Sequence, residues 1–561
     1  MLTSEDIRRL RDKFWQSKSH KWLPPDKLVP TQGDTTAMFT LAWMQQLVPY
    51  LMWKPHPLGK RLYNIQKCVR TNDIEEVWDE RHLTFFEMMW NWSLGDYFKK
   101  DAINWSVEFL TKYLGIPLNK IGATVFKWEW DIPKDEESKQ IWKEVWIEGD
   151  RIKELGKDDN FRWPAWEIWP CWPCTEIYFD RGDLRWPADW NLWENDRYLE
   201  IRNNVFMEYY KDKSWNYTRL KQQNVDTWMG LERITMVLQE VPTVFETDLF
   251  IPILRVVEKF VKKTYPLKDL SYDNIKNLSK NKIISILDSV KDSIDLKRFR
   301  VIADHIRSSI FLIADGVIPS NEWRGYVLRR LIRRLYYNLI LLNPGLNLED
   351  VEKFVDEVVE VIAKKYWPWR QEVKDEKENV KKILFSEITK FDKTIRRGLK
   401  LLEDILNTIG ESKISWEIVF KLYDTYGFPV ELIKEIVESK WLEVDVEGFK
   451  NFMKQAQEKS RQATKDIFKR GIDWGKYLEW IPQTEFVWYD QLELDNPKLL
   501  KDFAVEIDWK PQRVLVFDKT PFYAESWWQT GDRWVIILDN GETLKVKDVK
   551  KYAGVFLHFV E

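Results

Sequence analysis

Hydrophobic and polar positions divide the chain into regions of different periodicity. Residues 1 to about 245 contain apolar residues spaced by three and four, at 4–18 and 99–114, together with strand-like runs. Spacing by three and four predicts amphipathic helices, whereas alternation predicts strands with one buried face. From about 298 to 470 the helical spacing dominates and glycines are few. The pattern therefore predicts a mixed region followed by a helical one.

The last part of the chain, from about residue 484, has short strand-like runs separated by turns. These runs lie at 503–507, 513–517 and 535–538. They are followed by Asn540 and Gly541, a dipeptide that favours tight hairpin turns. We expect a small β-barrel here, which makes the whole chain an α+β protein.

Composition narrows the class of protein. Charged residues make up 32% of the 561 residues and the net charge is −3, so the chain is not a globally basic nucleic-acid coat. No apolar run approaches the ~20 residues that span a bilayer, and we expect no membrane partner. The cysteines, Cys68, Cys171 and Cys174, are too few for a disulfide framework and suit a reducing cytoplasm. The pair Cys171 and Cys174 has half of a zinc-site spacing, but a structural loop is the favoured interpretation.

A first candidate site lies at residues 224–233, where Asp226 and Arg233 flank a turn before a helix. A carboxylate there can hold an ammonium group, and a guanidinium can hold phosphate or stack on a purine. A salt bridge at a helix N-terminus is the alternative for this segment taken alone. A second cationic site lies upstream, at 67–73 and 80–88, and reads as strand, polar loop and strand with Arg70 at the base of the loop. A solvated hairpin with a buried pair of phenylalanines is the alternative there.

These two segments belong to a series of motifs that resembles the N-terminal part of alanyl-tRNA synthetase, a class II aminoacyl-tRNA synthetase. The motifs cover essentially the whole chain in the family's order, at 68–70, 84–88, 93–99, 170–177, 225–234, 300–307, 315–334, 423–429 and 520–526. The resemblance implies a class II catalytic domain at 1–245, with an antiparallel sheet flanked by helices. It further implies a helical domain that recognises the tRNA acceptor stem at 246–475. Residues 484–561 would then be the β-barrel that begins the editing region.

The resemblance also implies a chemistry. Alanyl-adenylate forms when the carboxylate of alanine attacks the α-phosphate of ATP, so the catalyst contributes mainly positive charge and positioning. Arg70 matches the arginine that bridges this phosphate and the amino-acid carboxylate, and Phe86 matches the ring that stacks on adenine. Arg233 matches the arginine on the other face of the adenine. Asp226 matches the acid that fixes the ammonium group, and Asn203 matches an asparagine that lines the alanine pocket. The expected catalytic residues are Arg70, Asp226 and Arg233.

Further ATP contacts and two departures from the family pattern follow from the same match. Arg81 and His82 lie where the family's loop contacts phosphate. ATP and Mg²⁺ are the implied cofactors, and the sequence identifies no Mg²⁺ ligands. Thr71 alone stands where the family usually has Ala-Gly-Gly-Lys-His, so a lysine contact to ATP is missing. Arg202 stands where the family often has tryptophan beside the pocket asparagine.

The RNA side rests on four arginines spaced i, i+1, i+4 and i+5, which places them on one face of a helix. A solvated cationic face and a row that contacts phosphate are both open, and the second would bind with strong salt dependence. In the family this region and a segment further on meet the acceptor stem of tRNA-Ala. The resemblance implies alanine, ATP and tRNA-Ala as partners. It assigns tRNA binding to Asn321, Arg329, Arg330, Arg333, Arg334 and Asp424.

Family members continue into a zinc-dependent editing core and a C-terminal domain, so we expect this chain to be an N-terminal fragment. Its histidines, at 20, 56, 82, 305 and 558, include no His-x-x-x-His pair. Zinc is therefore expected only in the missing editing domain, and a stand-alone editing hydrolase is disfavoured. A non-catalytic RNA-binding paralogue would keep the arginine row but lose Arg70, Asp226 or Arg233, and all three are present. That paralogue, or an inactive fragment, is the alternative to an alanine–tRNA ligase.

Tryptophan is unusually abundant, with 33 Trp against 21 Gly. Much of the excess falls where the family has glycine, a residue used for positive φ or for close backbone approach. We hypothesise that these codons are UGA, translated here as tryptophan but read as glycine in the source organism. UGG codons at 43, 163, 228 and 528 would disprove this. The positions are Trp43, Trp78, Trp90, Trp146, Trp163, Trp166, Trp169, Trp172, Trp228, Trp323, Trp416, Trp441, Trp527, Trp528 and Trp534.

Overall fold

The protein divides into two compact units, residues 1–395 and 396–561, which we describe separately. The predicted boundaries at 245, 475 and 484 remain a prediction. The computed structural model describes residues 1–561 except 31–37, 42–46, 53, 72–73, 129–131, 146, 148–150, 163–168, 183–196, 212–216, 322, 409–412, 427–429, 439–441, 450, 453–476, 487–493, 495–496, 508–509, 523–534, 539 and 553.

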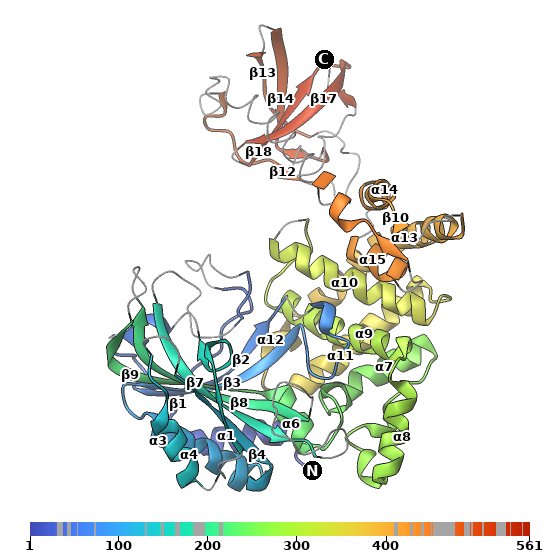
Figure 1. Ribbon diagram of the computed structural model, residues 1–561. Helices are drawn as coiled ribbons and strands as arrows, with labels where there is room; N and C mark the ends of the chain where they lie inside the picture. Colours follow the sequence, from blue (N-terminus) through green and yellow to red (C-terminus); the bar gives the residue numbers. More distant parts are fainter. Residues whose placement is uncertain are drawn as a thin grey trace. The chain divides into compact units, whose positions relative to one another are not determined.

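A large sheet forms one side of the first unit, next to the helices that follow it in the chain (Figure 1). Its strands are β1 Lys21–Trp22, β2 Arg61–Val69, β3 Phe85–Leu94, β4 Ile121–Phe126, β5 Ile152–Leu155, β6 Phe161–Arg162, β7 Trp169–Asp180, β8 Tyr198–Lys211 and β9 Tyr217–Gly230. They are ordered β1-β2-β3-β9-β8-β7-β4-β5, with β6 paired to β7. The pairs from β2 to β4 are antiparallel, and only β1–β2 and β4–β5 are parallel. The predicted antiparallel sheet and the α+β class are confirmed.

Helices α1 (Ser4–Ser17), α3 (Lys99–Glu108) and α4 (Glu136–Glu144) lie together along one side of this sheet (Figure 1). Helix α1 begins at a capping box, in which Thr3 and Asp6 satisfy each other's backbone N–H groups. It buries Phe14 and Trp15 completely or nearly so. A π-helical turn continues α3. The helices predicted at 4–18 and 99–114 are thereby confirmed. Three shorter helices in this part are α2 Val48–Met52, α5 Lys157–Asn160 and α6 Leu231–Leu238.

The rest of the first unit is helical, and from about residue 298 onward its periodicity predicted this. The helices are α7 Ile251–Val261, α8 Lys280–Val290, α9 Ile294–Ala314, α10 Trp323–Leu342, α11 Leu348–Tyr366, α12 Gln371–Asp375 and α13 Lys377–Thr408, the last of which continues past the boundary of the unit at residue 395. Helix α9 is buried along most of its length and packs on both α10 and β3. A stacked pair of rings, Phe85 of β3 and Phe311 of α9, with centroids 4.1 Å apart, joins the sheet to the helices.

The second unit contains helices α14 (Trp416–Tyr426) and α15 (Val430–Glu438), the short pair β10 (Lys413–Ile414) with β11 (Glu443–Val444), and a five-stranded sheet. The sheet runs β13-β14-β18-β17-β16 and is antiparallel throughout. Gly541 turns the chain at φ +82, where a side chain is disfavoured. The three strand runs predicted near the C-terminus are confirmed as β13 Leu499–Ile507, β14 Lys510–Phe517 and β16 Val535–Ile537. The sheet also contains β17 Thr543–Tyr552 and β18 Val555–Val560, which were not predicted one by one, and the unit has a short parallel pair, β12 Glu485–Phe486 with β15 Lys519–Thr520.

Two tryptophans adopt a backbone conformation that suits glycine. Trp323, at the start of α10, has φ +50 and is 72% exposed. Trp480 has φ +69 and is 94% exposed. For a residue with a Cβ atom this conformation costs roughly 1–2 kcal/mol, and neither exposed ring gains burial to offset it. Trp323 belongs to the glycine-position set, whereas Trp480 does not belong to it and shares only the positive φ. Outside the described residues lie Trp43, Trp146, Trp163, Trp166, Trp441, Trp527, Trp528 and Trp534.

Candidate active site

The strand register gathers the predicted pocket residues on one face of the large sheet. Residues directly opposite in an antiparallel pair share a face. One row across neighbouring strands contains Trp90, Trp228, Asn203 and Glu176, from β3, β9, β8 and β7. The next row contains Trp92 and Asp226 side by side. Asn203 and Asp226, far apart in sequence, therefore lie in adjacent rows of one surface.

Arg202, whose effect on the pocket the sequence left open, lies on the opposite face. Its guanidinium donates to the Ser106 hydroxyl (2.9 Å) and to Asn91 Oδ1 (2.6 Å), and it lies 5.6 Å from the Trp15 ring centroid. Burial lowers the pKa of Arg202 to about 9. Successive strand residues point to opposite faces, so this arginine does not enter the face that holds Asn203.

Asp226 is a buried carboxylate, only 4% exposed. Burial raises the pKa of Asp226 to about 8, against a smaller lowering contribution from Trp92. Within the described part of the chain, its Oδ1 atom has no hydrogen-bond partner. An unsatisfied buried carboxylate oxygen is costly, and a ligand ammonium group would satisfy it.

Asn203 is also fully buried, and its Nδ2 group donates to Glu176 Oε1 over 2.8 Å. That contact orients the amide so that Oδ1 is the free acceptor, and this atom has no partner among the described residues. Two buried acceptors, on Asn203 and Asp226, thus share one face of the sheet. Such a pair suits a small ligand that donates hydrogen bonds.

Tryptophan side chains cover this same face. Trp90 stacks on Trp92 with centroids 5.7 Å apart and planes at 5°, and Trp228 packs against Trp90 at 6.4 Å. Trp228 is partly buried against the surrounding apolar cluster. Trp90 and Trp228 both belong to the glycine-position set. Their rings occupy space beside Asp226 and Asn203 that glycine would leave open.

The hairpin of β2 and β3 holds the next site residues. Arg70 follows the last residue of β2, and its backbone N–H donates to the Thr84 carbonyl (3.0 Å). Its guanidinium lies 5.0 Å from the centroid of the Phe86 ring. A cation on an aromatic face is a favourable contact that fixes both groups. The predicted hairpin is confirmed, and it brings Arg70 and Phe86 together.

Arg233 lies in the first turn of α6, directly after β9 ends at Gly230. Its Nη1 group donates to Glu200 Oε2 (3.2 Å) and to the Glu200 carbonyl (3.4 Å). The side chain stays 27% exposed, so the guanidinium remains within reach of a ligand. Glu200 and Glu176 were not predicted. The available signal was only that each is an acidic residue next to an apolar isoleucine, Ile177 or Ile201, within a strand.

In the loop between β2 and β3, Arg81 and His82 both form hydrogen bonds with the side chain of Asp79. Both backbone N–H groups donate to Asp79 Oδ1, over 2.8 and 2.7 Å. The His82 ring bonds the other Asp79 oxygen and lies 3.6 Å from Glu76. Asp79 therefore shapes this end of the loop.

The four arginines of α10 all contact carboxylates of the protein itself. Arg329 and Arg333 pair with Glu387 at 3.0 and 3.2 Å. Arg330 and Arg334 pair with Glu75 in the β2–β3 loop. The four arginines share a helix, as predicted. Their side chains differ in exposed fraction: Arg330 and Arg333 are 22% and 23% exposed, whereas Arg329 and Arg334 are only 11% and 10% exposed.

The two remaining predicted RNA contacts lie on other segments. Asn321 accepts a hydrogen bond from Arg329 just before α10. Asp424 lies in α14, and its side chain is outside the described residues.

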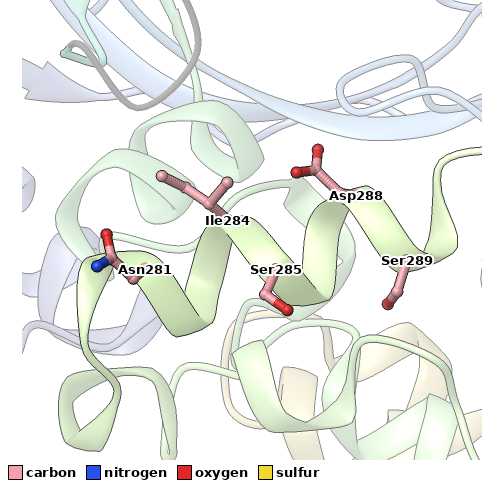
Figure 2. Close-up of a pocket in the computed structure, with 5 residues that line it drawn as sticks. All are labelled: Asn281, Ile284, Ser285, Asp288 and Ser289. Atoms are coloured by element: carbon pink, nitrogen blue, oxygen red, sulfur yellow. The ribbon is translucent and has the colours of Figure 1, made fainter.

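A surface depression of about 630 Å³ lies along α8 and holds none of the predicted site residues (Figure 2). It is lined by Asn281, Ile284, Ser285, Asp288 and Ser289. In the described ranges, no group of three or more His, Cys, Asp or Glu side chains is placed to hold a metal ion. No described helix is long and apolar enough to cross a membrane.

The chain is similar over nearly its whole length to curated alanine–tRNA ligases. It is 39% identical over 577 residues to an alanine–tRNA ligase of Thermotoga maritima, an alignment covering 100% of this chain and 61% of that protein. Alanine–tRNA ligases of Caldicellulosiruptor saccharolyticus and Bacillus subtilis are each 38% identical, over 99% and 98% of this chain and 60% of each relative. The chain thus spans about three fifths of these curated relatives. The family model of class II tRNA synthetases (A) matches residues 6–561. The chain therefore belongs to the class II tRNA synthetases (A).

Proposed function

We propose that the protein activates alanine with ATP to form alanyl-adenylate and transfers the alanyl group to the 3′ end of tRNA-Ala. The observation that carries this proposal is the pair of buried acceptors, Asp226 Oδ1 and Asn203 Oδ1, on one sheet face. Asp226 would hold the ammonium group of alanine, and Asn203 would line the same pocket. The similarity to alanine–tRNA ligases supports the choice of amino acid.

The nucleotide would lie beside this pocket. Arg70, fixed over Phe86, would bridge the α-phosphate and the alanine carboxylate, while Phe86 stacks on adenine. Arg233 would leave Glu200 and cover the other side of the nucleotide. Positive charge here stabilises the pentavalent arrangement in which two anions react. Arg81 and His82 are the further phosphate contacts that we propose.

Mg²⁺ would arrive bound to the phosphates of ATP, because it prefers phosphate oxygens and retained waters to an all-protein cage. We propose tRNA-Ala as the RNA partner, met through its acceptor stem by α10, Asn321 and Asp424. The reaction would take place in the cytoplasm. Zinc would belong only to an editing domain beyond the matched part of the family.

The test is alanine-dependent exchange of pyrophosphate into ATP, measured on the full chain and on Trp228→Gly. The Trp228 ring packs beside the buried acceptors, so we expect exchange to rise at least about tenfold in Trp228→Gly. Trp323→Gly is the matched control, because Trp323 belongs to the same glycine-position set but is exposed at the start of α10, outside the β2–β3 loop and the face that holds Asp226 and Asn203. No exchange from a folded Trp228→Gly protein that binds ATP would contradict the proposed function and favour a non-catalytic RNA-binding paralogue.

A further inference from the structure

Where the backbone pairing of strands β3 and β9 ends, the side chain of Glu232 connects β3 to helix α6. The last backbone pair of β3 and β9 is Met88 with Gly230. The next N–H of β3, on Glu87, donates to both oxygens of the Glu232 carboxylate, over 3.1 and 3.3 Å. Glu232 lies in the first turn of α6 and is 2% exposed. The carboxylate thus takes the place of a strand partner.

This hydrogen bond joins the two elements that carry the proposed ATP contacts. Glu87 directly follows Phe86, whose ring lies against Arg70. Glu232 directly precedes Arg233. Neighbouring residues of a strand point to opposite faces, so Glu87 lies behind the face that holds Phe86. The contact can therefore set the spacing of Phe86 and Arg233 without touching the ligand.

Buried arginines keep the two carboxylates in place. Arg8 and Arg370 both bind Glu87, with Arg370 Nε 2.8 Å from Oε1. Arg307 of α9 binds Glu232, and its guanidinium is packed between aromatic rings, 4.8 Å from that of Phe85. Removing one partner of such a buried pair leaves the other charge uncompensated. Glu232 is thereby tied to Arg307 as well as to β3.

We propose that Glu232, held by Arg307, is a positioning residue for ATP: it fixes the distance between the strand that carries Phe86 and the helix that carries Arg233. This rests on the proposed function, because it takes Phe86 and Arg233 as the two sides of the nucleotide site. A misplacement of about 1 Å at such a site costs up to about a hundredfold in rate. Loss of this contact should therefore weaken ATP binding while the protein stays folded.

The experiment is equilibrium dialysis of radiolabelled ATP with Mg²⁺ against the full chain and its variants. Both Glu232 oxygens accept from the Glu87 N–H, and one of them also accepts from Arg307. An amide NH₂ in Glu232→Gln therefore removes one of the two acceptors for the Glu87 N–H, whichever way the amide is turned. We expect the Kd for ATP to rise at least about tenfold. Glu246→Gln is the matched control, since Glu246 is an equally buried carboxylate that binds Thr243 and Tyr265 instead. It should lower the melting temperature and leave the Kd for ATP within about twofold.

A second variant guards against misfolding. The double variant Glu232→Gln/Arg307→Gln removes both buried charges together. The single variant Arg307→Gln is measured beside it. If Arg307 acts through Glu232, the Kd of the double variant for ATP should match that of whichever single variant, Glu232→Gln or Arg307→Gln, binds ATP more weakly, because residues that act as a unit are not additive. Multiplied losses, an unchanged Kd in folded Glu232→Gln, or an equal loss in Glu246→Gln would each overturn the proposal. Lack of alanine-dependent exchange in a Trp228→Gly chain that binds ATP would instead contradict the proposed function alone.

Discussion

At the residue scale, the environment of single side chains decides what each can do. Asp226 and Asn203 were expected from their place in motifs, and the register explains how they meet. The tryptophans show the opposite effect, because Trp90 and Trp228 bring bulk to the same surface. A small-molecule site needs both acceptors and space. The acceptors are present, and the space depends on whether glycine or tryptophan stands at these positions.

The first prediction concerns the pH dependence of stability at Asp226. Its pKa is raised from 3.8 to about 8 by burial. The folded state therefore holds the proton more tightly than the unfolded chain, and this contribution to stability is lost as pH rises from about 4 to 8. Asp226→Asn should raise the unfolding free energy at both pH values, and by roughly 2–5 kcal/mol more at pH 9 than at pH 5. Urea denaturation at both pH values measures this.

Asp96→Asn is the control of opposite sign. The hydrogen bond from Arg61 lowers the pKa of Asp96, so its ionised form stabilises the fold at neutral pH and loses that effect as pH falls through the lowered pKa. The asparagine variant should be the less stable one at pH 9. If Asp226→Asn destabilised the protein equally at both pH values, the buried carboxylate would not be neutral at neutral pH.

A second prediction tests the backbone at Trp323. With φ at +50 and a ring that is 72% exposed, the residue has the conformation of glycine without compensating burial. Trp323→Gly should raise the unfolding free energy by about 1 kcal/mol. Trp78→Gly should lower it, since Trp78 has no positive φ and loses its contact with Lys297, 4.1 Å from the ring centroid. Thermal unfolding of the two variants measures these opposite effects. Destabilisation by both substitutions would contradict the inference that the backbone at Trp323 suits glycine.

At the scale of elements, the β2–β3 loop and helix α10 are joined by ion pairs. Glu75 of the loop forms ion pairs with Arg330 and Arg334. The Ile74 carbonyl also accepts a hydrogen bond from Arg334 (2.8 Å). The loop carries proposed ATP contacts and the helix carries proposed RNA contacts. Helical spacing placed the arginines on one face, but only the packing showed that acids from β2–β3 and α13 reach them.

The third prediction separates these arginines by exposure. Arg330 pairs with Glu75, which is 55% exposed, so RNA phosphate can compete for it. Arg330→Gln should weaken binding of an acceptor-stem RNA and reduce the slope of log affinity against log salt by about 1. Arg334→Gln should mainly lower the melting temperature, because Arg334 is buried against Ile74 and His305.

Arg255→Gln is the control, since Arg255 is an exposed arginine of α7 that pairs with Asp273. Filter binding of the RNA between 50 and 200 mM salt is the measurement. Equal salt slopes for the parent chain and Arg330→Gln would show that this arginine does not contact phosphate.

At the scale of the whole molecule, the candidate site belongs to the first compact unit. The sheet, α6 and the buried arginine network all lie within residues 1–395. We predict that removing residues 409–561 leaves the Kd for ATP within about twofold of that of the full chain, because no residue of the nucleotide site is lost. Equilibrium dialysis measures it. Loss of ATP binding by a folded truncated chain would mean that the second unit contributes to the site.

The sequence by itself determined the class of fold, the helices and strands of strong periodicity, and the family. Local spacing suffices for these, because a helix at 4–18 or a strand at 513–517 follows from which side chains must be buried. Only the tertiary structure decided that Arg202 lies on the sheet face opposite Asn203, that Glu75 and Glu387 form ion pairs with the α10 arginines, and that Glu232 connects β3 to α6. These contacts join residues far apart in sequence, such as Glu232 and Arg307, and depend on strand register and helix packing, which no local pattern specifies.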